Sequence, residues 1–534
     1  MAADRKMAVH KRNRIEFWVF LVLLMGIAIA FCCAKKDFFT DEMAQYGLSN
    51  SYYNPFLRTI YDNNLDDNII YGKDLMNYIV VNKGERFAYD SVYYNQTQDV
   101  HPPLYYMVTH TICSVFYGTF SKWTGLVPNL IFLALMLAIL YQFGVRLFES
   151  HKIGIMLMIL YGTSTSATSN YTMVRMYQPL ALLTLLLAYE LLRLLQSDRP
   201  RLIYPAIFIT VCAGMLTHYF YLFYAFFACA FVFFYLLGKK CYKKLWRFSV
   251  SALLGVGAMV LIYPYILTSL SGQGNLSVDY SLKRCVTDII RMTLYMGRGM
   301  LLCAVVGGIG ILILLYGAIK NKKAQGKRLA YPKNTEYAAL LLVPAVLAFL
   351  VIALVGPLER YAFHLTPFVV LFAGLIWAFV IVRYSMAGRV LDSNIMRVCY
   401  MVIAFCMVWF VYQPKFLYRD AGTSYEIAKQ YHTSPCVYMN GTNAEVGIVG
   451  NLIQMSYFDD ICLQANPWSD KIVDYIEAHP DNETVVIYIA ERIDAADDDD
   501  EVNIIKNRLS KEYSAELVRF GDFTRMYVLR AVES

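Results

Sequence analysis

The run His101-Pro102-Pro103-Leu104-Tyr105-Tyr106 closes a polar segment, residues 35–101, which separates a first hydrophobic helix from a long series of apolar segments. Asp41 and Glu42 follow the first helix closely, and Asp99 and His101 stand just before the chain turns apolar again. Ionisable groups this near a lipid boundary are costly unless they are paired or used. We therefore interpret the polar segment as the catalytic loop of a membrane enzyme.

The composition is that of a membrane protein. Of the 534 residues, 58% are hydrophobic and only 17% are charged, and many windows of about 20 apolar residues fit a bilayer. The net charge of +7 is unevenly distributed, because residues 415–534 carry −10 and the remainder carries +17. The cations lie in short loops between apolar segments, which argues against nucleic-acid binding.

The N-terminus predicts a membrane helix. Five basic residues precede an apolar run over residues 17–34, and a signal peptide is the alternative interpretation. The run is long and no small-residue cleavage site precedes Asp37, which favours an uncleaved helix with its basic end in the cytoplasm. Residues 35–101 are then outside.

Residues 102–120 decide the topology. If they crossed the membrane, the basic loops 238–244 and 320–328 would both be external. If they lie along the surface, these loops are cytoplasmic, as are 193–201 and 383–389, in keeping with the positive-inside rule. Thr109, His110, Thr111 and Ser114 interrupt the run, which suits an interfacial helix. We assign it as a juxtamembrane helix.

The fold predicted is mostly α, a polytopic membrane protein with about 11 transmembrane helices plus juxtamembrane helices. Residues 1–414 form the membrane-embedded domain, with an external catalytic loop over 35–125. After the first helix, spans are expected near 127–147, 152–169, 171–195, 202–217, 218–237, 248–267, 294–318, 337–355, 361–383 and 397–413. The external loops then include 170–175, 217–219, 267–291 and 356–361.

Residues 415–534 predict a small, soluble, extracytoplasmic α/β domain. Strands are expected at 435–439, 484–490 and 525–530, with helices near 444–457, 469–478 and 502–513. No Gly-rich phosphate loop occurs there, and the acid run 497–501 is interpreted as a solvated loop. The 12 cysteines lack metal-ligand spacing, and Cys436 and Cys462 are expected to stay unpaired.

Five motifs in order resemble the GT-C glycosyltransferases, in particular the family 39 group related to protein O-mannosyltransferases and aminoarabinose transferases. They span about residues 15–385. The resemblance implies a polyprenyl-phosphate-sugar-dependent inverting transferase, a hexosyl or pentosyl transferase, acting on an acceptor outside the cytoplasm. The motifs are Asp41-Glu42, His101-Pro102-Pro103-Leu104-Tyr105-Tyr106, Arg175-Met176-Tyr177, Thr217-His218-Tyr219 and Glu359-Arg360-Tyr361.

The chemistry asks for the same residue types. Inverting transfer needs a carboxylate that takes the proton from the acceptor hydroxyl, and cationic or hydrogen-bonding groups at the leaving phosphate. Asp41 and Glu42 are adjacent and cannot both face the acceptor. By family position Asp41 is the base and Glu42 a positioning or structural partner, with Asp99 as a secondary acidic residue. The expected substrate-binding residues are His101, Tyr105, Arg175, Tyr177, His218, Tyr219, Arg360 and Tyr361.

Each residue taken alone also has a structural interpretation. Arg175, Arg298 and Arg360 could be interfacial anchors at helix ends. His218 could be a polar contact between helices. His101 could cap the juxtamembrane helix, and the family sometimes has Lys at this position, which leaves a phosphate contact open.

The rival hypothesis is a non-enzymatic flippase or transporter of lipid-linked sugars. A transporter should carry ionisable residues at mid-helix depth and symmetric halves. This chain keeps its charges at external helix ends, which favours the enzyme. No cofactor is indicated, and the lack of ligand spacing leaves a divalent metal open. The expected partners are the lipid-linked donor, the membrane and a lipid, polysaccharide or protein acceptor. The expected location is the plasma membrane.

Overall fold

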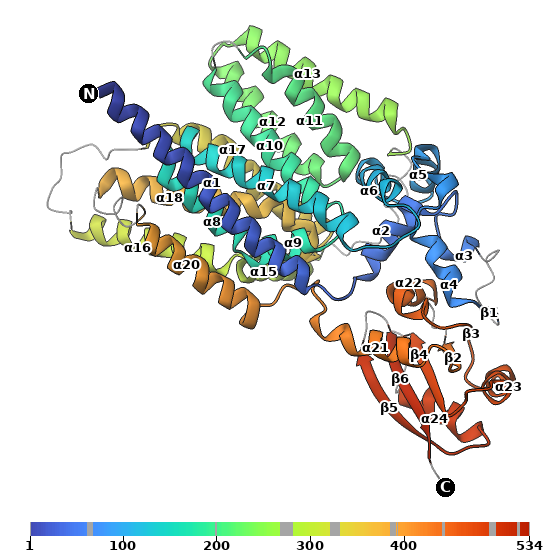
Figure 1. The fold of residues 1–534 in the computed structure, drawn as a ribbon. Coiled ribbons are helices and arrows are strands. Elements are labelled where there is room, and N and C mark those ends of the chain that lie inside the picture. The colour runs from blue at the N-terminus through green and yellow to red at the C-terminus, as the bar shows by residue number, and fades with distance from the viewer. Residues whose placement is uncertain are drawn as a thin grey trace. The chain divides into compact units, whose positions relative to one another are not determined.

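The computed structural model describes residues 2–60, 68–197, 200–266, 281–320, 332–384, 391, 393–439, 444–490, 498–520 and 524–532 (Figure 1). The chain divides into two compact units. Residues 1–33, 126–172 and 176–415 form the helical unit, and residues 34–125, 173–175 and 416–534 form the loop–tail unit. The chain passes from the helical unit to the loop–tail unit between residues 415 and 416, and the polar loop belongs to the same unit as the tail.

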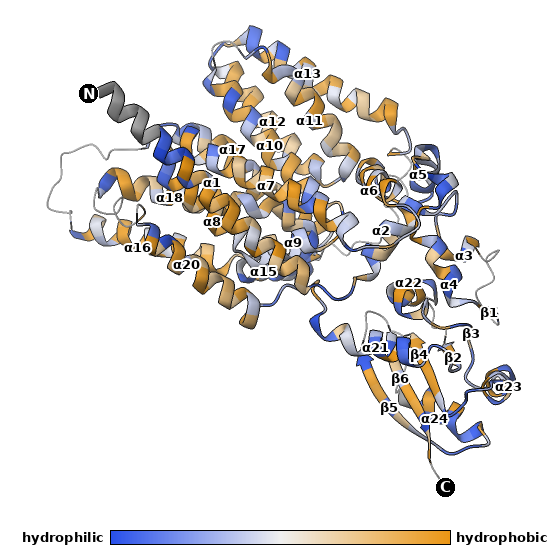
Figure 2. Ribbon diagram, viewed as in Figure 1, coloured by the Kyte–Doolittle hydropathy of each residue, from blue (hydrophilic) through white to orange (hydrophobic). Residues whose placement is uncertain are grey.

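The helical unit contains the segments that can cross a membrane, and Figure 2 shows apolar residues along most of their length. Within the described ranges, nine helices are long and apolar enough, and two shorter apolar helices, α8 (His151–Gly162) and α11 (Ile203–Thr217), accompany them. Together they occupy the eleven positions expected from the sequence. The nine are α1 (Ala2–Ala34), α7 (Trp123–Arg146), α10 (Tyr177–Gln196), α12 (Tyr221–Gly238), α13 (Tyr242–Ile262), α16 (Leu301–Lys320), α17 (Thr335–Val355), α18 (Thr366–Arg383) with the preceding η4 (Glu359–Leu365), and α20 (Asn394–Cys406) continued by η5 (Met407–Val411).

Two expected spans differ in detail. The span near 152–169 is broken at Thr163 and Ser164 into α8 and α9 (Thr165–Thr172). Residues 282–299, expected as loop and the start of a span, form a separate helix, α15 (Leu282–Gly299). It carries charges on one side while Val286, Ile290 and Leu294 are exposed on another. An amphipathic helix of this kind suits the membrane surface rather than its interior.

Small residues let helices approach closely in the helical unit. A Cβ atom on Gly144 of α7 would lie 2.2 Å from the Gly154 Cα of α8, so neither position can take a larger residue without separating the helices. Close contact between backbones is the usual way in which membrane helices gain packing energy. Other helices that pack in pairs are α11 with α13, α12 with α17 and α16 with α18.

The loop part of the loop–tail unit is built from short helices. They are α2 (Thr40–Asn50), α3 (Leu57–Ile60), α4 (Gly72–Leu75), η1 (Met76–Tyr78), η2 (Lys83–Glu85), α5 (Tyr89–Thr97) and α6 (Leu104–Val115). The predicted juxtamembrane helix is α6. Its 12 residues span about 18 Å, less than the roughly 30 Å of a hydrocarbon core. The side of the membrane on which it lies stays a prediction.

The tail folds as an α/β layer around one six-stranded sheet of order β1-β3-β2-β4-β6-β5. Strands β2, β3 and β4 are parallel, and β1, β5 and β6 pair antiparallel. The elements are η6 (Arg419–Ala421), α21 (Gly422–Gln430), β2 (Cys436–Met439), α22 (Ala444–Met455), β3 (Ile461–Gln464), α23 (Asp470–Ala478), β4 (Thr484–Ala490), α24 (Asp498–Arg508), β5 (Tyr513–Phe520) and β6 (Thr524–Ala531).

Alternate side chains of the buried strands face different layers, as the period of two requires. Val437 and Met439 pack with α23 and α24 in one apolar core. On the other face Tyr438 extends under Gly447 of α22, and Phe458 packs edge-on against Tyr488. The helix α22 also packs against α2 and α4 of the loop, so it joins the two parts of the unit.

The strands predicted at 435–439, 484–490 and 525–530 correspond to β2, β4 and β6. Strands β3 and β5 and helix α21 were not expected. The helix predicted over 502–513 ends at Arg508, and β5 begins at Tyr513. Cys436 and Cys462 are both buried, and they form no disulfide with each other. Residues 198–199, 267–280, 321–331 and 385–390 of four predicted loops, and residue 497 of the acid run, lie outside the described residues.

The loop also supplies a strand to the tail. Residues Ile69 and Ile70 form β1 (Ile69–Ile70), which pairs with Ile461 and Cys462 at the edge of the sheet. The backbone N–H of Lys36 donates to the carbonyl of Leu417 at 2.9 Å. The tail is therefore joined to the polar loop by backbone pairing as well as by side chains.

Candidate functional site

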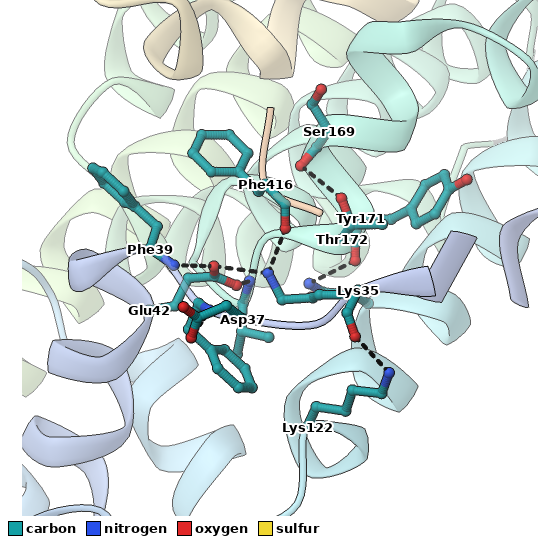
Figure 3. A network of polar contacts seen from close by, with 12 residues as sticks. Lys35, Asp37, Phe39, Glu42, Lys122, Ser169, Tyr171, Thr172 and Phe416 are labelled. Carbon is teal, nitrogen blue, oxygen red and sulfur yellow. Dashed lines mark hydrogen bonds and ion pairs between the residues drawn. The ribbon is translucent and has the colours of Figure 1, made fainter. Parts of the chain in front are cut away.

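Glu42 is the buried anchor of the polar loop. Its carboxylate accepts hydrogen bonds from the Lys35 ammonium at 2.9 Å, from the Phe39 N–H at 2.8 Å and from the Val174 N–H at 2.6 Å. The Lys35 and Glu42 side chains are both 0% exposed. Lys35 also donates to the Phe416 carbonyl at 2.6 Å, as Figure 3 shows. Burial raises the pKa of Glu42, although the Lys35 charge and the backbone N–H groups oppose the rise.

Asp41 stands beside Glu42 in the first turn of α2 but points elsewhere. Successive residues of a helix are about 100° apart, so the two carboxylates cannot share a direction. The Asp41 side chain is half-buried. Its backbone carbonyl accepts a hydrogen bond from the Arg175 guanidinium at 3.1 Å. The surroundings of Glu42 are thus those of a structural carboxylate, and the Asp41 carboxylate is the more accessible of the two.

Three further groups form a chain that ends on the same arginine. The Arg175 Nη1 donates to the Tyr106 hydroxyl at 3.3 Å, and this hydroxyl donates to the Asp99 carboxylate at 3.5 Å. The Asp99 carboxylate lies 2.8 Å from the His101 Nδ1. Tyr105, also predicted, is buried in the first turn of α6.

Asp99 is ionised across the physiological range. Burial works to raise its pKa, but the neighbouring His101 and the Arg175 charge outweigh burial and lower the pKa to about 2. An ionised carboxylate only accepts hydrogen bonds, so the His101 Nδ1 must be the donor. The Nε2 atom is then the end of the ring that is directed away from the Asp99 pair.

The loop–tail unit therefore brings together predicted residues that are far apart in sequence. Asp41, Asp99, His101 and Arg175 all belong to one network of contacts. Sequence reasoning did not single out Lys35 or Tyr106 as site residues. A signal was present for both, because Lys35 is a charge directly after an apolar helix and Tyr106 closes the quoted motif.

A second group of predicted residues meets in the helical unit. The rings of Tyr177, His218 and Tyr361 form a triangle with centroid separations of 5.7, 6.1 and 6.2 Å. The Arg360 guanidinium lies over the Tyr361 ring, 5.4 Å from its centroid. Phe220, which sequence reasoning missed, packs edge-on against Tyr361 at 4.7 Å.

Local structure explains why these rings meet. The segments that carry them are the start of α10, the turn between α11 and α12, and η4. His218 is 5% exposed, and its Nδ1 accepts the Phe220 N–H at 3.0 Å, which places the proton of a neutral ring on Nε2. Tyr219 is half-buried in the same turn. A cation beside aromatic faces is well placed to attract an anionic ligand while the rings exclude water.

The part of the chain that the structure describes holds no group of three or more His, Cys, Asp or Glu side chains arranged to bind a metal ion.

Comparison with known proteins agrees with the fold. Residues 100–267 match the family described as dolichyl-phosphate-mannose-protein mannosyltransferase. ArnT from Cupriavidus metallidurans, solved bound to undecaprenyl phosphate, superposes with a TM-score of 0.53 at 12% identity, over 96% of this chain and 97% of that chain. Its apo structure gives 0.53 at 11% identity over the same shares.

A third solved structure is more distant. The Archaeoglobus fulgidus oligosaccharyltransferase gives a TM-score of 0.45 at 10% identity, over 94% of this chain and 69% of that chain. Comparison with curated protein sequences gave no match. The matched region contains the His101, Arg175 and His218 motifs, and the fold extends over nearly the whole chain. The chain therefore has the GT-C fold of a polytopic membrane protein, which it shares with ArnT, and its residues 100–267 resemble the protein mannosyltransferase family.

Proposed function

We propose that this protein is an inverting glycosyltransferase that takes a sugar from a polyprenyl-phosphate donor and passes it to an acceptor outside the cytoplasm. The observation that carries the proposal is the Arg175 junction, which joins the Asp41 backbone to the Tyr106, Asp99 and His101 chain. It gathers a carboxylate and cationic groups, the two kinds of group that inverting transfer requires. ArnT, which shares the fold, has been solved with undecaprenyl phosphate bound.

The reaction is a single displacement. The acceptor oxygen forms a bond to the anomeric carbon as the bond from that carbon to the phosphate oxygen breaks. Asp41 takes the proton that the acceptor hydroxyl loses, and the electron pair of the broken bond leaves on the polyprenyl phosphate. The configuration at the anomeric carbon is inverted because attack and departure occur on opposite faces.

The other residues have distinct proposed roles. Arg175 holds the Asp41 backbone and contributes positive charge to the loop. Arg360, with the rings of Tyr177, His218 and Tyr361, is proposed to bind the donor phosphate, which gains charge in the transition state. Glu42 and Lys35 fix the start of α2, and the tail is proposed to select or position the acceptor.

The proposed setting is the cell membrane, with the N-terminus cytoplasmic and the tail outside. The transferred sugar is proposed to be a hexose or a pentose, and a comparison of turnover with the two kinds of polyprenyl-phosphate donor distinguishes them. The proposed acceptor class is a lipid, a polysaccharide or a protein, each of which presents a hydroxyl or amine at the membrane surface.

Asp41→Asn tests the proposal, because it keeps the shape and removes the base. Turnover in reconstituted membranes should fall by about 10²- to 10⁴-fold, the usual contribution of a general base, while donor binding stays near that of the natural protein. A fully active Asp41→Asn variant moves the base to Asp99 or Glu42. If substitutions at those two residues were also without effect on turnover, a lipid-linked-sugar transporter would be the better account.

A further inference from the structure

A polar cavity of about 300 Å³ lies in the loop–tail unit, where β5 approaches the segment that leads into α21. This size is at the lower end of the range for small-molecule sites in proteins, roughly 300–1,000 Å³. The motifs and the proposed catalytic network do not account for it. Its walls are Tyr418, Asp420, Ala421, Leu517, Val518 and Arg519.

Both walls of this cavity have an irregular backbone. Tyr418 has φ 48° and ψ 49°, the left-handed region that bulky residues rarely adopt. On the facing strand the register with β6 shifts between Leu517 and Arg519, so Val518 is an extra residue. A bulge redirects the side chains that follow it, and left-handed non-glycine residues cost free energy. Such features gather at binding sites more than at ordinary turns.

The redirected side chain is Arg519, and its charge is already balanced. Its Nη2 forms an ion pair with the Asp37 carboxylate at 2.5 Å, and its Nη1 donates to the Ser424 hydroxyl at 3.3 Å. Asp37, 4% exposed, also accepts hydrogen bonds from the Tyr425 hydroxyl at 2.7 Å and the Gln454 amide at 3.2 Å. The cavity therefore presents guanidinium N–H donors without an excess of positive charge.

The balance of charge disfavours a phosphate ligand. Asp420 lines the same cavity and is exposed, so an anion there would meet a carboxylate of its own sign. A neutral ligand with many hydroxyl groups fits better. Its hydroxyls can donate to Asp420 and accept from Arg519, while its C–H surface packs on Tyr418 and Leu517. A pyranose ring combines these properties.

We propose that this cavity binds a sugar ring of the acceptor. The identification of this sugar as part of the acceptor rests on the proposed transferase function. The walls of the cavity are in contact with the loop that carries Asp41. Arg519 holds Asp37, three residues before α2. The Lys35 ammonium, which pairs with Glu42, lies over the Tyr418 ring at 5.8 Å from its centroid. A sugar bound here would thus stabilise the start of α2.

The test measures binding of methyl hexopyranosides (the mannoside, glucoside and galactoside) and of inorganic phosphate by saturation-transfer NMR. The full chain is held in a zwitterionic detergent that contains no sugar. Val518→Trp adds bulk at a residue that lines the cavity and leaves both members of the Arg519–Asp37 pair unsubstituted. Ala515→Trp adds the same bulk at an exposed position of the same strand that does not line the cavity. Tyr418→Asn removes the ring and keeps a residue that tolerates the left-handed backbone.

We expect at least one hexopyranoside to bind to the natural chain. Val518→Trp and Tyr418→Asn should weaken its binding by about tenfold or more, and Ala515→Trp should change it by no more than about twofold. The absence of binding by all three glycosides would overturn the proposal. So would unchanged affinity in Val518→Trp, or a phosphate signal that Val518→Trp removes.

The test is independent of turnover. Glycoside binding is measured without a donor, so an inactive enzyme does not affect it. If Asp41→Asn showed that the chain is no transferase, a sugar site lost in Val518→Trp would still stand as a binding site. If transfer were confirmed but no glycoside bound, the cavity assignment would fail while the proposed function stood.

Discussion

Replacement of Glu42 by Ala separates a structural carboxylate from a catalytic one. It removes three hydrogen-bond acceptor contacts and leaves the Lys35 ammonium, 0% exposed, with the Phe416 carbonyl but without its counter-charge. Breaking a buried ion pair by removal of one partner costs about 3–5 kcal/mol. For a unit of roughly 200 residues this lowers Tm by about 6–20 °C.

The assay is thermal unfolding of the purified protein in detergent, followed by intrinsic fluorescence, with turnover measured well below Tm. Asp41→Asn is the matched control on the adjacent residue and should leave Tm near that of the natural protein while turnover falls. The double variant Lys35→Met with Glu42→Leu removes both charges and should recover much of the lost Tm, because paired apolar replacements are often neutral. If Glu42→Ala kept its Tm but abolished transfer, Glu42 would act in the chemistry and the roles of the two carboxylates would have to be exchanged.

Three further predictions concern the donor, pH and topology. Arg360→Ala should raise the donor dissociation constant and lower turnover together, whereas an Arg360→Ala variant with unchanged donor affinity would exclude a phosphate contact. The pKa of Asp99 is depressed from 3.8 to about 2, so its stabilisation of about 2 kcal/mol is present above about pH 4 and is lost as the pH falls towards 2. Asp99→Asn should remove that part of the acid transition in Tm measured from pH 6 to 2, and an identical acid transition would contradict the pairing with His101. Lys471→Cys, made in a variant whose natural cysteines have been replaced, should be labelled by a membrane-impermeant thiol reagent in intact cells. Protection of this cysteine from the reagent would place the tail inside.

The bilayer made the helical unit predictable from sequence. A span needs a continuous apolar stretch of fixed length, so hydropathy located the nine helices of the described chain that are long enough to cross, together with the shorter apolar helices α8 and α11. The helix α15 was not predicted, because it is amphipathic and has too many charges for a span. The break between α8 and α9 was not predicted either. Thr163 and Ser164 lower the mean hydropathy of the segment only slightly, although they separate the two helices.

The sheet of the tail was only partly predictable for a different reason. Strands β4 and β6 have long apolar or alternating patterns, and they were found together with the four-residue strand β2. Strand β3, which also has four residues, was missed, and β1 is two residues contributed by the polar loop nearly 400 positions earlier. No local sequence pattern predicts a pairing between segments that are so distant. Strand β5 was missed because its exposed face has polar residues like those at the end of a helix.

The same contrast applies to the candidate site. The motif positions of Asp41, His101 and Arg175 could be recognised because residue type and order are local properties of the sequence. The partners that fix them could not, since the Lys35 contact with the Phe416 carbonyl and the Arg519 pair with Asp37 join residues separated by several hundred positions. Pairing of this kind is a property of the folded chain.

These long-range contacts change how the role of the tail can be tested. Both buried charges at the start of the loop, Lys35 and Asp37, are held by groups that the tail supplies. Deletion of residues 416–534 would therefore expose an unbalanced charge beside α2 and disturb Asp41, whatever the tail does with the acceptor. Loss of transfer after deletion cannot separate acceptor selection from support of the base. A point variant at Val518 leaves the Arg519–Asp37 pair and the Tyr418 ring beside Lys35 unsubstituted, so it can separate them.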